Sequence, residues 1–359
     1  MKAKNRSFLI PIILSFLVPL TVSPVLAEDS VGDLDRAGQT IRQSMAQLGV
    51  NKNDQGILLL TNAYYGQVNG GSAEQYRDLL SDITGCTSGK RSLLDVHTAF
   101  NEALWFALWQ KTTNKVVFSR LQGGTFQSQT IDAAPEKLLD VKSWKQASDG
   151  LIGARTLFQV VSIGLAWSAG TDWQILKVAG FHDSIAPGVN MGYLFHSFLE
   201  KRMPGEKGEE WLFFGAVPKC YMDTLQIMYG ATLGNMRAFG VSMSPDQLNK
   251  YKTKGAMPCI VALKVNRSKD LCQGVVLGFS RKRVMDDLGV READLNPKGG
   301  DNNPVFCIAR IRGCMQMAKL KTEDQVKWIV EIRRFSGAAS LAESVCNAGG
   351  DPYAVVWAK

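Results

Sequence analysis

The chain has 359 residues, 45% of them hydrophobic, and its 41 basic and 33 acidic side chains give a formal net charge of +8. This length suits two ordinary domains or one large duplicated domain, and the apolar content can fill a core. The basic residues are scattered along the chain, which argues against a nucleic-acid-binding protein.

Residues 1–27 have the pattern of an export signal. Lys2, Lys4 and Arg6 precede a largely apolar run from Phe8 to Leu20, and small residues follow as a cleavage site. The run is too short for a lasting membrane anchor. We therefore expect a periplasmic or extracellular mature protein with no stable anchor and no nucleic-acid partner.

The mature part contains all seven cysteines. An oxidising compartment makes disulfides the default expectation, and the odd number leaves at least one thiol unpaired. No two cysteines form a C-x-x-C pair, which argues against a thioredoxin-type redox centre and against a zinc ribbon. The cysteines are Cys86, Cys220, Cys259, Cys272, Cys307, Cys314 and Cys346.

The first half of the chain, to about residue 145, has the pattern of one α+β unit. Its second helix runs into Gly85, which is placed to end that helix in a left-handed conformation. A hairpin follows across Thr112–Lys115. The expected elements are helices at 34–48 and 73–83 and strands at 56–60, 103–110 and 116–120.

The turn after Gly85 is rich in glycine and hydroxyl groups and ends in Gly89 and Lys90. It does not predict a phosphate-binding P-loop, because only three residues separate its glycines, a helix precedes it and an exported protein meets no ATP supply. Its cations instead predict a surface that attracts a small anionic ligand. We expect Thr87, Lys90 and Arg91 to be the ligand-binding residues.

A shift of 145 residues aligns a second copy of this helix and turn with the first. A second hairpin, 258–265 with 271–279, follows it. A shared helix, glycine stop and turn form one supersecondary unit, which predicts two tandem related units at 28–145 and 146–290, each a mixed sheet with packed helices. The matched pairs include Tyr76 with Tyr221, Asp78 with Asp223, Leu80 with Leu225, Gly85 with Gly230, and Thr87 with Thr232.

The two copies differ in side chains that can bind metals. Cys86 and His97 have no counterpart in the second copy, and Cys220 has none in the first. Thiolate and imidazole are the usual zinc ligands, and three protein ligands plus water make an open site. The pattern therefore predicts a composite zinc-like site in a cleft between the units, with ligands from both.

His182 is the fourth expected metal ligand, or an acid/base group near the metal. It precedes a helix that is expected to begin near Pro187, with Asp183 or Ser184 as its N-cap. A histidine ahead of a helix N-terminus faces the positive end of the dipole, which favours the neutral, metal-binding imidazole.

Three motifs of the second half resemble the FmdE family, which takes its name from a component of formylmethanofuran dehydrogenase. Residues 182–192 are similar to G-H-x-C-P-G-x-x-x-G, 220–226 to C-x-x-D-x-x-Q, and the Gly230 turn to T-G-C-T-x-G-K, of which the first half holds a fuller copy. Ala186 and Ala231 stand where the family has cysteines. The resemblance covers most of the mature chain. It implies an α+β fold, frequently with bound zinc and a dimer-like cleft, which allows a homodimer.

Residues 291–359 are expected to form a short strand-rich extension. Segments 306–312, 326–332 and 353–357 alternate in the manner of strands, and a short helix is expected at 338–345. A disulfide among the three cysteines of this region is the simplest use of their thiols.

Together these patterns predict an exported FmdE-like protein that binds a zinc-like metal through Cys86, His97, Cys220 and His182. They leave open whether it is a metal-dependent enzyme, because no paired carboxylates and no nucleophile with its base fix a reaction. The alternatives are a non-enzymatic metal- or small-ligand carrier and a Cys86–Cys220 disulfide joining the halves.

Overall fold

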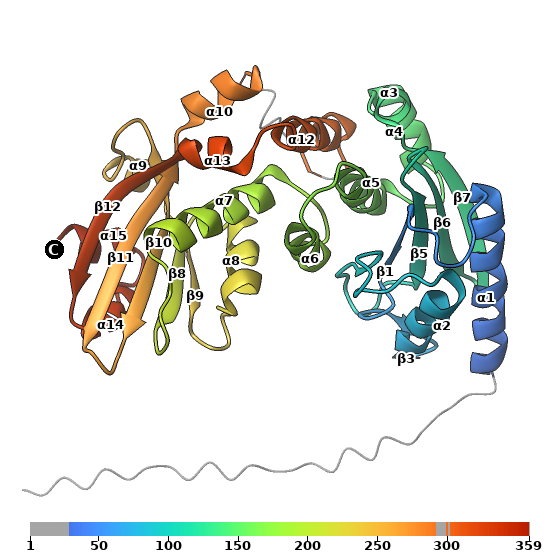
Figure 1. The fold of residues 1–359 in the computed structure, drawn as a ribbon, viewed down its shortest axis with the longest axis horizontal. Helices are drawn as coiled ribbons and strands as arrows, with labels where there is room; N and C mark the ends of the chain where they lie inside the picture. Colours follow the sequence, from blue (N-terminus) through green and yellow to red (C-terminus); the bar gives the residue numbers. More distant parts are fainter. Residues whose placement is uncertain (1–28, 292–298, 301, 359) are drawn as a thin grey trace, which may run out of the picture.

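The computed structural model describes residues 29–291, 299–300 and 302–358. The predicted export signal at residues 1–27 lies outside this described part. No helix among the described residues is both long and apolar enough to cross a membrane. Two five-stranded mixed sheets stand at opposite ends of an elongated molecule, each flanked by helices (Figure 1). The predicted α+β class with two packed units is therefore confirmed.

The first sheet has the order β4-β1-β5-β6-β7, in which β1 and β4 run parallel and the other pairs antiparallel. All five residues of β1 are buried, as expected of an inner strand covered on both faces. Helices α1 and α2 cover one face, and α4 and α5 cover the other. The elements are α1 (Asp29–Leu48), β1 (Ile57–Thr61), β2 (Gln67–Val68), β3 (Gly71–Ser72), α2 (Glu74–Thr84), β4 (Leu93–Asp95), β5 (Trp105–Gln110), β6 (Lys115–Gln122), β7 (Thr125–Asp132), α3 (Pro135–Leu138), α4 (Val141–Ser148) and α5 (Ala154–Ser168).

The second sheet has the order β12-β11-β10-β8-β9, and its parallel pair is β8 with β9. Helices α7 and α8 pack on one face, and α14 and α15 pack on the other. The elements are α7 (Pro187–Arg202), β8 (Glu210–Ala216), α8 (Tyr221–Tyr229), β9 (Ala238–Val241), α9 (Pro245–Asn249), β10 (Met257–Asn266), β11 (Leu271–Phe279), α10 (Arg281–Leu288), α13 (Thr322–Gln325), the 3-10 helix η1 (Val326–Trp328), β12 (Ile329–Gly337), α14 (Ser340–Cys346) and α15 (Pro352–Trp357).

The two units follow the same plan, with one helix between the two parallel strands. Helices α2 and α8 both end at a left-handed glycine, Gly85 with φ 75° and Gly230 with φ 59°, as predicted. A side chain five residues later closes each turn on the glycine carbonyl: Lys90 Nζ donates at 3.0 Å, and Asn235 Nδ2 at 2.7 Å. The shared glycines and turn polar groups therefore have a structural role in both copies.

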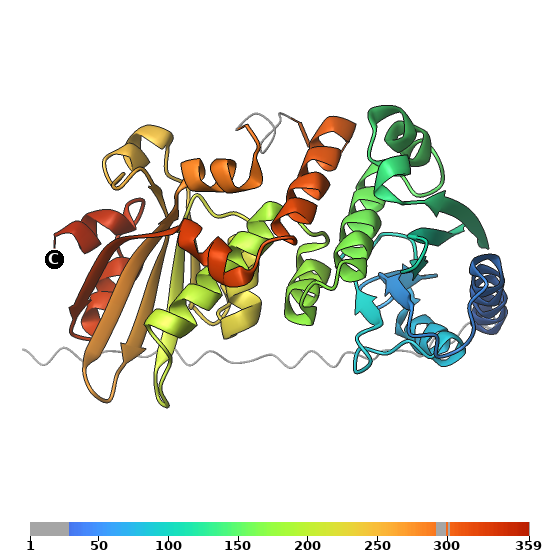
Figure 2. The ribbon, with the colours of Figure 1, turned by 45° about the horizontal axis from the view of Figure 1, so that its top comes forward.

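Two helices lie between the sheets and join the units, α6 (Trp173–His182) and α12 (Pro304–Met317) (Figures 1 and 2). Helix α12 comes late in the chain, yet its Ile308 and Ile311 belong to the hydrophobic core of the first unit. Helix α6 meets the end of β4, where the His97 N–H donates to the Gly180 carbonyl at 2.8 Å. Helix α5, which lies beyond the predicted boundary at residue 145, also packs on the first sheet.

The strands predicted in the last part of the chain are largely wrong. Segment 306–312 lies within helix α12, and segment 353–357 lies within α15. Each helix has an N-cap followed by proline, the Asn303 side chain accepting from the Val305 N–H and Asp351 accepting from the Ala354 N–H. These capping signals outweigh the apparent period-two alternation. The helix predicted at 338–345 is confirmed as α14, and the strand predicted at 326–332 begins later, at Ile329.

The expected disulfides are not formed. No disulfide joins any of the seven cysteines, all of which lie in the described part of the chain. Cys86 belongs to the core under the first sheet, whereas Cys220 begins helix α8 of the second unit, so the two do not form the proposed link between the halves. The expectation of a disulfide among the C-terminal cysteines is also wrong.

Gly164→Ala tests the packing of α5 on the first sheet. An added Cβ would overlap the fully buried Trp109 ring, so we expect the free energy of unfolding to fall by about 1–3 kcal/mol. Gly313→Ala in α12 is the matched control, because its Cβ would meet only Pro187 Cγ, at 3.8 Å. We expect the control to be neutral or stabilised by up to about 1 kcal/mol. Urea unfolding followed by tryptophan fluorescence measures both, and equal destabilisation would contradict this packing.

Candidate functional site

A strained turn leads from β8 into α8. Val217 has φ 68°, a left-handed conformation that is unfavourable for a β-branched residue. Two hydrogen bonds hold it there: its N–H donates to the Val241 carbonyl at 2.7 Å, and the Tyr221 hydroxyl donates to its carbonyl at 2.7 Å. Such strain persists only where the surroundings impose it, and it clusters at functional sites. The turn delivers Cys220 to the N-cap position of α8.

Helix α7 approaches Cys220 closely because it carries glycine at the contact. A Cβ on Gly188 would lie 2.9 Å from Cys220 Cβ and 3.2 Å from its Sγ. One turn later Gly192 faces Thr224, whose hydroxyl donates to the Val189 carbonyl at 3.1 Å. The two glycines of the sequence motif thus serve the packing of α7 on α8 around the thiol.

His182 is the side chain that meets Cys220. It is the last residue of α6, and its Nδ1 lies 2.7 Å from Asp223 Oδ2. The Cys220 thiol lies close enough to the imidazole for the two groups to shift each other's pKa. Asp223 lies in the first turn of α8, and its Oδ1 accepts from Gln226 Nε2 at 3.3 Å. A thiol, an imidazole and a carboxylate therefore form one connected cluster, Cys220–His182–Asp223.

The predicted setting of His182 is wrong in two respects. It is the last residue of helix α6, which Asp183 (φ 78°) terminates while pairing with Arg155 at 2.9 Å. Helix α7 does begin at Pro187, but its N-cap is Ala186, with no side-chain cap. At a helix C-terminus the dipole favours the imidazolium rather than the neutral ring.

The pKa shifts describe an ion pair. Burial disfavours the charged His182, but its hydrogen bonds to Asp223 and Cys220 outweigh burial and raise its pKa to about 10. Burial would raise the pKa of the Cys220 thiol, yet the hydrogen bond and charge of His182 and the Arg310 guanidinium lower it. Burial raises the pKa of the other thiols with a clear shift, which are Cys86, Cys259, Cys272, Cys314 and Cys346. Cys220 is therefore the thiol of this group that favours the thiolate.

The other predicted metal ligands lie apart from this cluster. Cys86 is 1% exposed in the core of the first unit and hydrogen-bonds Thr84 and Ser92. The exposed His97 ring contacts Tyr65, at 4.6 Å between ring centroids, and stacks on Phe181 at 5.9 Å. His97 thus contacts α6 through Phe181 and the Gly180 carbonyl, not through His182. Within the described ranges, no group of three or more His, Cys, Asp or Glu residues is arranged to hold a metal ion.

The predicted ligand-binding residues of the first turn engage their own turn. Lys90 Nζ donates to Asn53 Oδ1 at 2.8 Å as well as to the Gly85 carbonyl. The Thr87 hydroxyl accepts from the Lys90 N–H at 3.1 Å, and the Arg91 carbonyl accepts from Trp167 Nε1 at 3.1 Å. These hydrogen bonds hold the turn in place.

Asp223 and Arg310 were not among the predicted site residues. The C-x-x-D spacing places Asp223 three residues after Cys220, near it on one side of a helix, and this signal could have identified it. Arg310 lies on α12, and no sequence pattern connects it with α8.

A surface groove lies between α8 and β9, and Asp223 is the residue of the cluster that lines it. Its volume is about 330 Å³, and Asp223, Lys219 and Gln226 contribute its polar walls. Met222, Leu233 and Phe239 contribute apolar walls. The side chains of His182 and Asp223 are 20% and 30% exposed, so the cluster is partly open to solvent.

The comparisons with known proteins bear on this same region. Residues 181–258 match the family described as "FmdE, Molybdenum formylmethanofuran dehydrogenase operon". The match begins one residue before His182 and includes Cys220 and Asp223, so the resemblance is confirmed for the segment that carries the cluster. No curated protein matches the chain closely enough to count as a relative.

Alkylation by iodoacetamide tests the ion pair. Thiolate is the reactive form, so the rate at Cys220 should persist below the ordinary thiol pKa of 9.0 and fall only as the pH drops through its lowered pKa. Asp223→Asn removes the carboxylate that stabilises the charged imidazole, so the pKa of Cys220 should rise. We expect labelling at pH 7 to slow about tenfold, the effect of one pKa unit. Asp78→Asn, at the aligned position of α2, is the matched control. Peptide mapping by mass spectrometry identifies the labelled thiol. The ion pair would be refuted if Cys86 were labelled faster than Cys220, or if Asp223→Asn left the labelling rate of Cys220 unchanged.

Proposed function

Residues 181–258 of this chain form an FmdE-family segment, and we propose that the Cys220–His182–Asp223 cluster within it is a catalytic site that uses the Cys220 thiolate as a nucleophile. The observation that carries the proposal is the contact of one imidazole with both a carboxylate, at 2.7 Å, and a thiol whose pKa is lowered. Nucleophile, base and orienting carboxylate are the parts required for covalent catalysis.

Each side chain has a definite role in the proposed chemistry. Cys220 attacks an electrophilic acyl carbon and forms a thioester as the leaving group departs. His182 holds the proton that the thiol gives up and delivers it to the leaving group, and Asp223 orients the imidazolium and stabilises its charge. The N-terminus of α8 directs its positive dipole toward the thiolate. The neutral His182 then takes a proton from the water that attacks the thioester, so that the carboxylate product leaves and the thiolate and the imidazolium are restored.

The groove beside Asp223 supports a small substrate with an anionic group. The Lys219 ammonium offers a cation at the rim, and the Gln226 amide can hydrogen-bond a carbonyl. Met222, Leu233 and Phe239 suit a short apolar part. Lys219 is thus better placed than Lys90 to bind the predicted anionic ligand, because the Lys90 ammonium already donates to Asn53 and to the Gly85 carbonyl.

Metal binding is the second candidate function. A carboxylate behind a histidine, as Asp223 stands behind His182, is the usual arrangement that orients a metal ligand. Thiol and imidazole suit zinc, but Asp223 is engaged with the ring, and alanine occupies position 186, where the family has cysteine. Two donors fall short of the three that a catalytic zinc site requires. The residues present therefore do not fit a complete zinc site, and no step above passes through a metal. The composite site that adds Cys86 and His97 stays a prediction.

The units' shared strand order and the matching closure of both turns support a further proposal, that they arose by tandem duplication. The copies differ at the aligned positions 75 and 220, where the first has glutamine and the second has cysteine. Export and a homodimer stay predictions from the sequence.

Acylation by p-nitrophenyl acetate tests the proposed chemistry. We expect a burst of p-nitrophenol and an acetyl thioester on Cys220, detected by mass spectrometry. Cys220→Ala should abolish the burst, and His182→Gln should slow it about 10²–10⁴-fold, the usual contribution of general acid–base catalysis. Cys259→Ala is the control, because burial raises the pKa of that thiol to about 11. A burst that survives Cys220→Ala would overturn the proposal.

Elemental analysis of the same proteins tests the metal-binding alternative. One metal per chain that is lost in Cys220→Ala, together with no acylation, would favour a carrier function. Metal that is lost in Cys86→Ala as well would favour the composite site, whereas retention in that variant would exclude Cys86 as a ligand.

A further inference from the structure

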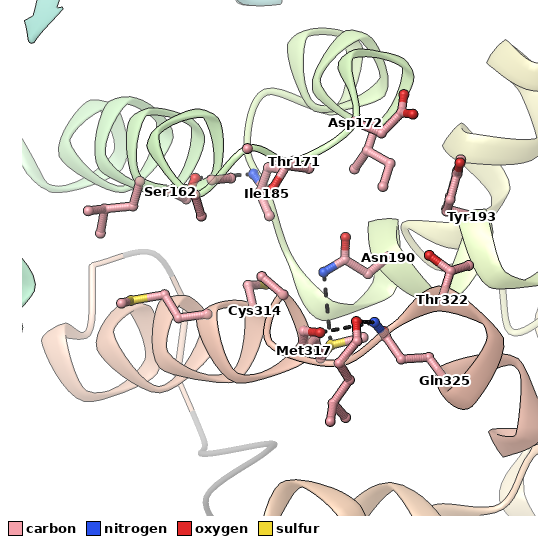
Figure 3. A pocket seen from close by; sticks show the side chains of 18 of the residues that line it. Ser162, Thr171, Asp172, Ile185, Asn190, Tyr193, Cys314, Met317, Thr322 and Gln325 are labelled. Atoms are coloured by element: carbon pink, nitrogen blue, oxygen red, sulfur yellow. Dashed lines mark hydrogen bonds between the residues drawn. The ribbon is translucent and has the colours of Figure 1, made fainter. Parts of the chain in front are cut away.

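A second cavity lies between helices of both units, where the α6–α7 linker crosses α5 and α12 (Figure 3). Its volume is about 230 Å³, smaller than the roughly 300–1,000 Å³ of sites for drug-sized ligands. It is distinct from the groove at Asp223, because the two share no lining residue.

Hydrogen bonds hold the walls of this cavity in place. The Ile185 N–H donates to Ser162 Oγ at 3.1 Å, which fixes the linker on α5. Gln325 Nε2 donates to the Met317 and Leu320 carbonyls at 2.9 Å each, which fixes the turn after α12. Walls fixed in this way make a preformed pocket, so ligand binding would cost little conformational entropy to order them.

Polar groups gather at one side of the cavity. Asn190 contacts the Met317 sulfur through its Nδ2 at 3.9 Å, and its amide oxygen points away from that contact (Figure 3). Tyr193 stands nearby, and its hydroxyl pKa is raised by burial and by the charge of Asp172. Asp172 uses Oδ1 to cap α6. The Asn190 amide and the Tyr193 phenol thus border one end of the cavity, and the exposed Asp172 carboxylate lies at its rim.

The rest of the lining mixes apolar side chains with Ser162, Thr171, Thr322 and Gln325, and it carries no positive charge. Leu165, Ile175, Ile311 and Met315 are among the lining side chains. The lining residues, all in the described part of the chain, include one carboxylate, Asp172, and no Lys, Arg or His. An anion would lose its hydration here without gaining a cation, which is costly. A neutral or singly cationic ligand meets no such penalty.

The geometry points to a second ligand site in this cavity, which takes a small uncharged or singly cationic amphiphile. Its polar head would hydrogen-bond Asn190 and Tyr193 near Asp172, and its apolar part would lie on Leu165, Ile175 and Ile311. This ligand class is opposite in charge preference to that of the Lys219 groove, so the two sites do not compete for one substrate.

The cavity and Cys220 lie on different sides of α7. Gly188 and Gly192 of that helix face α8, whereas Asn190 and Tyr193 face the cavity. Ligand binding in the cavity therefore does not require the thiol, and the two functions can fail independently.

Three probes with one ring and different heads test the site: benzylamine, benzyl alcohol and benzoate, titrated at pH 7 by saturation-transfer-difference NMR. We expect the amine and the alcohol to bind, and benzoate to bind at least about tenfold more weakly because its charge is unpaired. Asp172→Asn, which keeps a capping side chain, should remove any preference for the amine over the alcohol. Benzoate binding as tightly as the amine would overturn the proposal, as would no binding of any probe at millimolar concentration.

Matched variants locate the binding. Ala166 lines the cavity, so Ala166→Leu should fill part of it and weaken the amine and the alcohol about tenfold. Ala154→Leu on the same helix lies outside the lining and should leave binding unchanged. Cys220→Ser should also bind normally. Equal effects of the two leucine variants would refute the site, whereas bound probes with an unreactive Cys220 would refute only the catalytic proposal.

Discussion

The charge-assisted hydrogen bond between His182 and Asp223 is the interaction on which the functional region depends. It joins the last residue of α6 to the first turn of α8, and α6 in turn touches the first unit through the Gly180 carbonyl. One partly buried contact thus connects the junction helix with the helix that begins at the thiol. The cost of desolvating the imidazole is offset because Asp223 and Cys220 both raise its pKa and so stabilise its charged form.

The two units share one architecture, but only the second has the Cys220 cluster. Both have a helix between parallel strands, a left-handed glycine and a turn closed by a side chain on the glycine carbonyl. The second unit alone has cysteine at the start of that helix, with Val217 in a strained turn before it. The difference lies at the strand-to-helix entrance, where a helix dipole and a sharp turn favour a reactive thiolate.

Helix α12 makes the two units one structure. It comes from the C-terminal part of the chain but contributes Ile308 and Ile311 to the first core, and its Arg310 lowers the pKa of Cys220 in the second unit. The same helix provides Cys314 and Met315 to the cavity between α5 and α7. A single helix therefore borders both proposed sites, although they lie on different sides of α7.

The sequence by itself determined the α+β class, the glycine-ended helices, both hairpins and the start of α7. These features depend on local periodicity, on glycine at helix ends and on proline at N1, all of which act within a few residues of the chain. It also singled out Cys220 and His182. It misassigned α12 and α15 as strands, since caps at Asn303 and Asp351 decided those helices and alternation alone could not reveal them. Only the tertiary structure decided which polar groups meet. Packing between helices that are distant in the sequence pairs His182 with Asp223, separates Cys86 from Cys220 and brings Arg310 close. That packing sets the electrostatic environment of the Cys220 thiol.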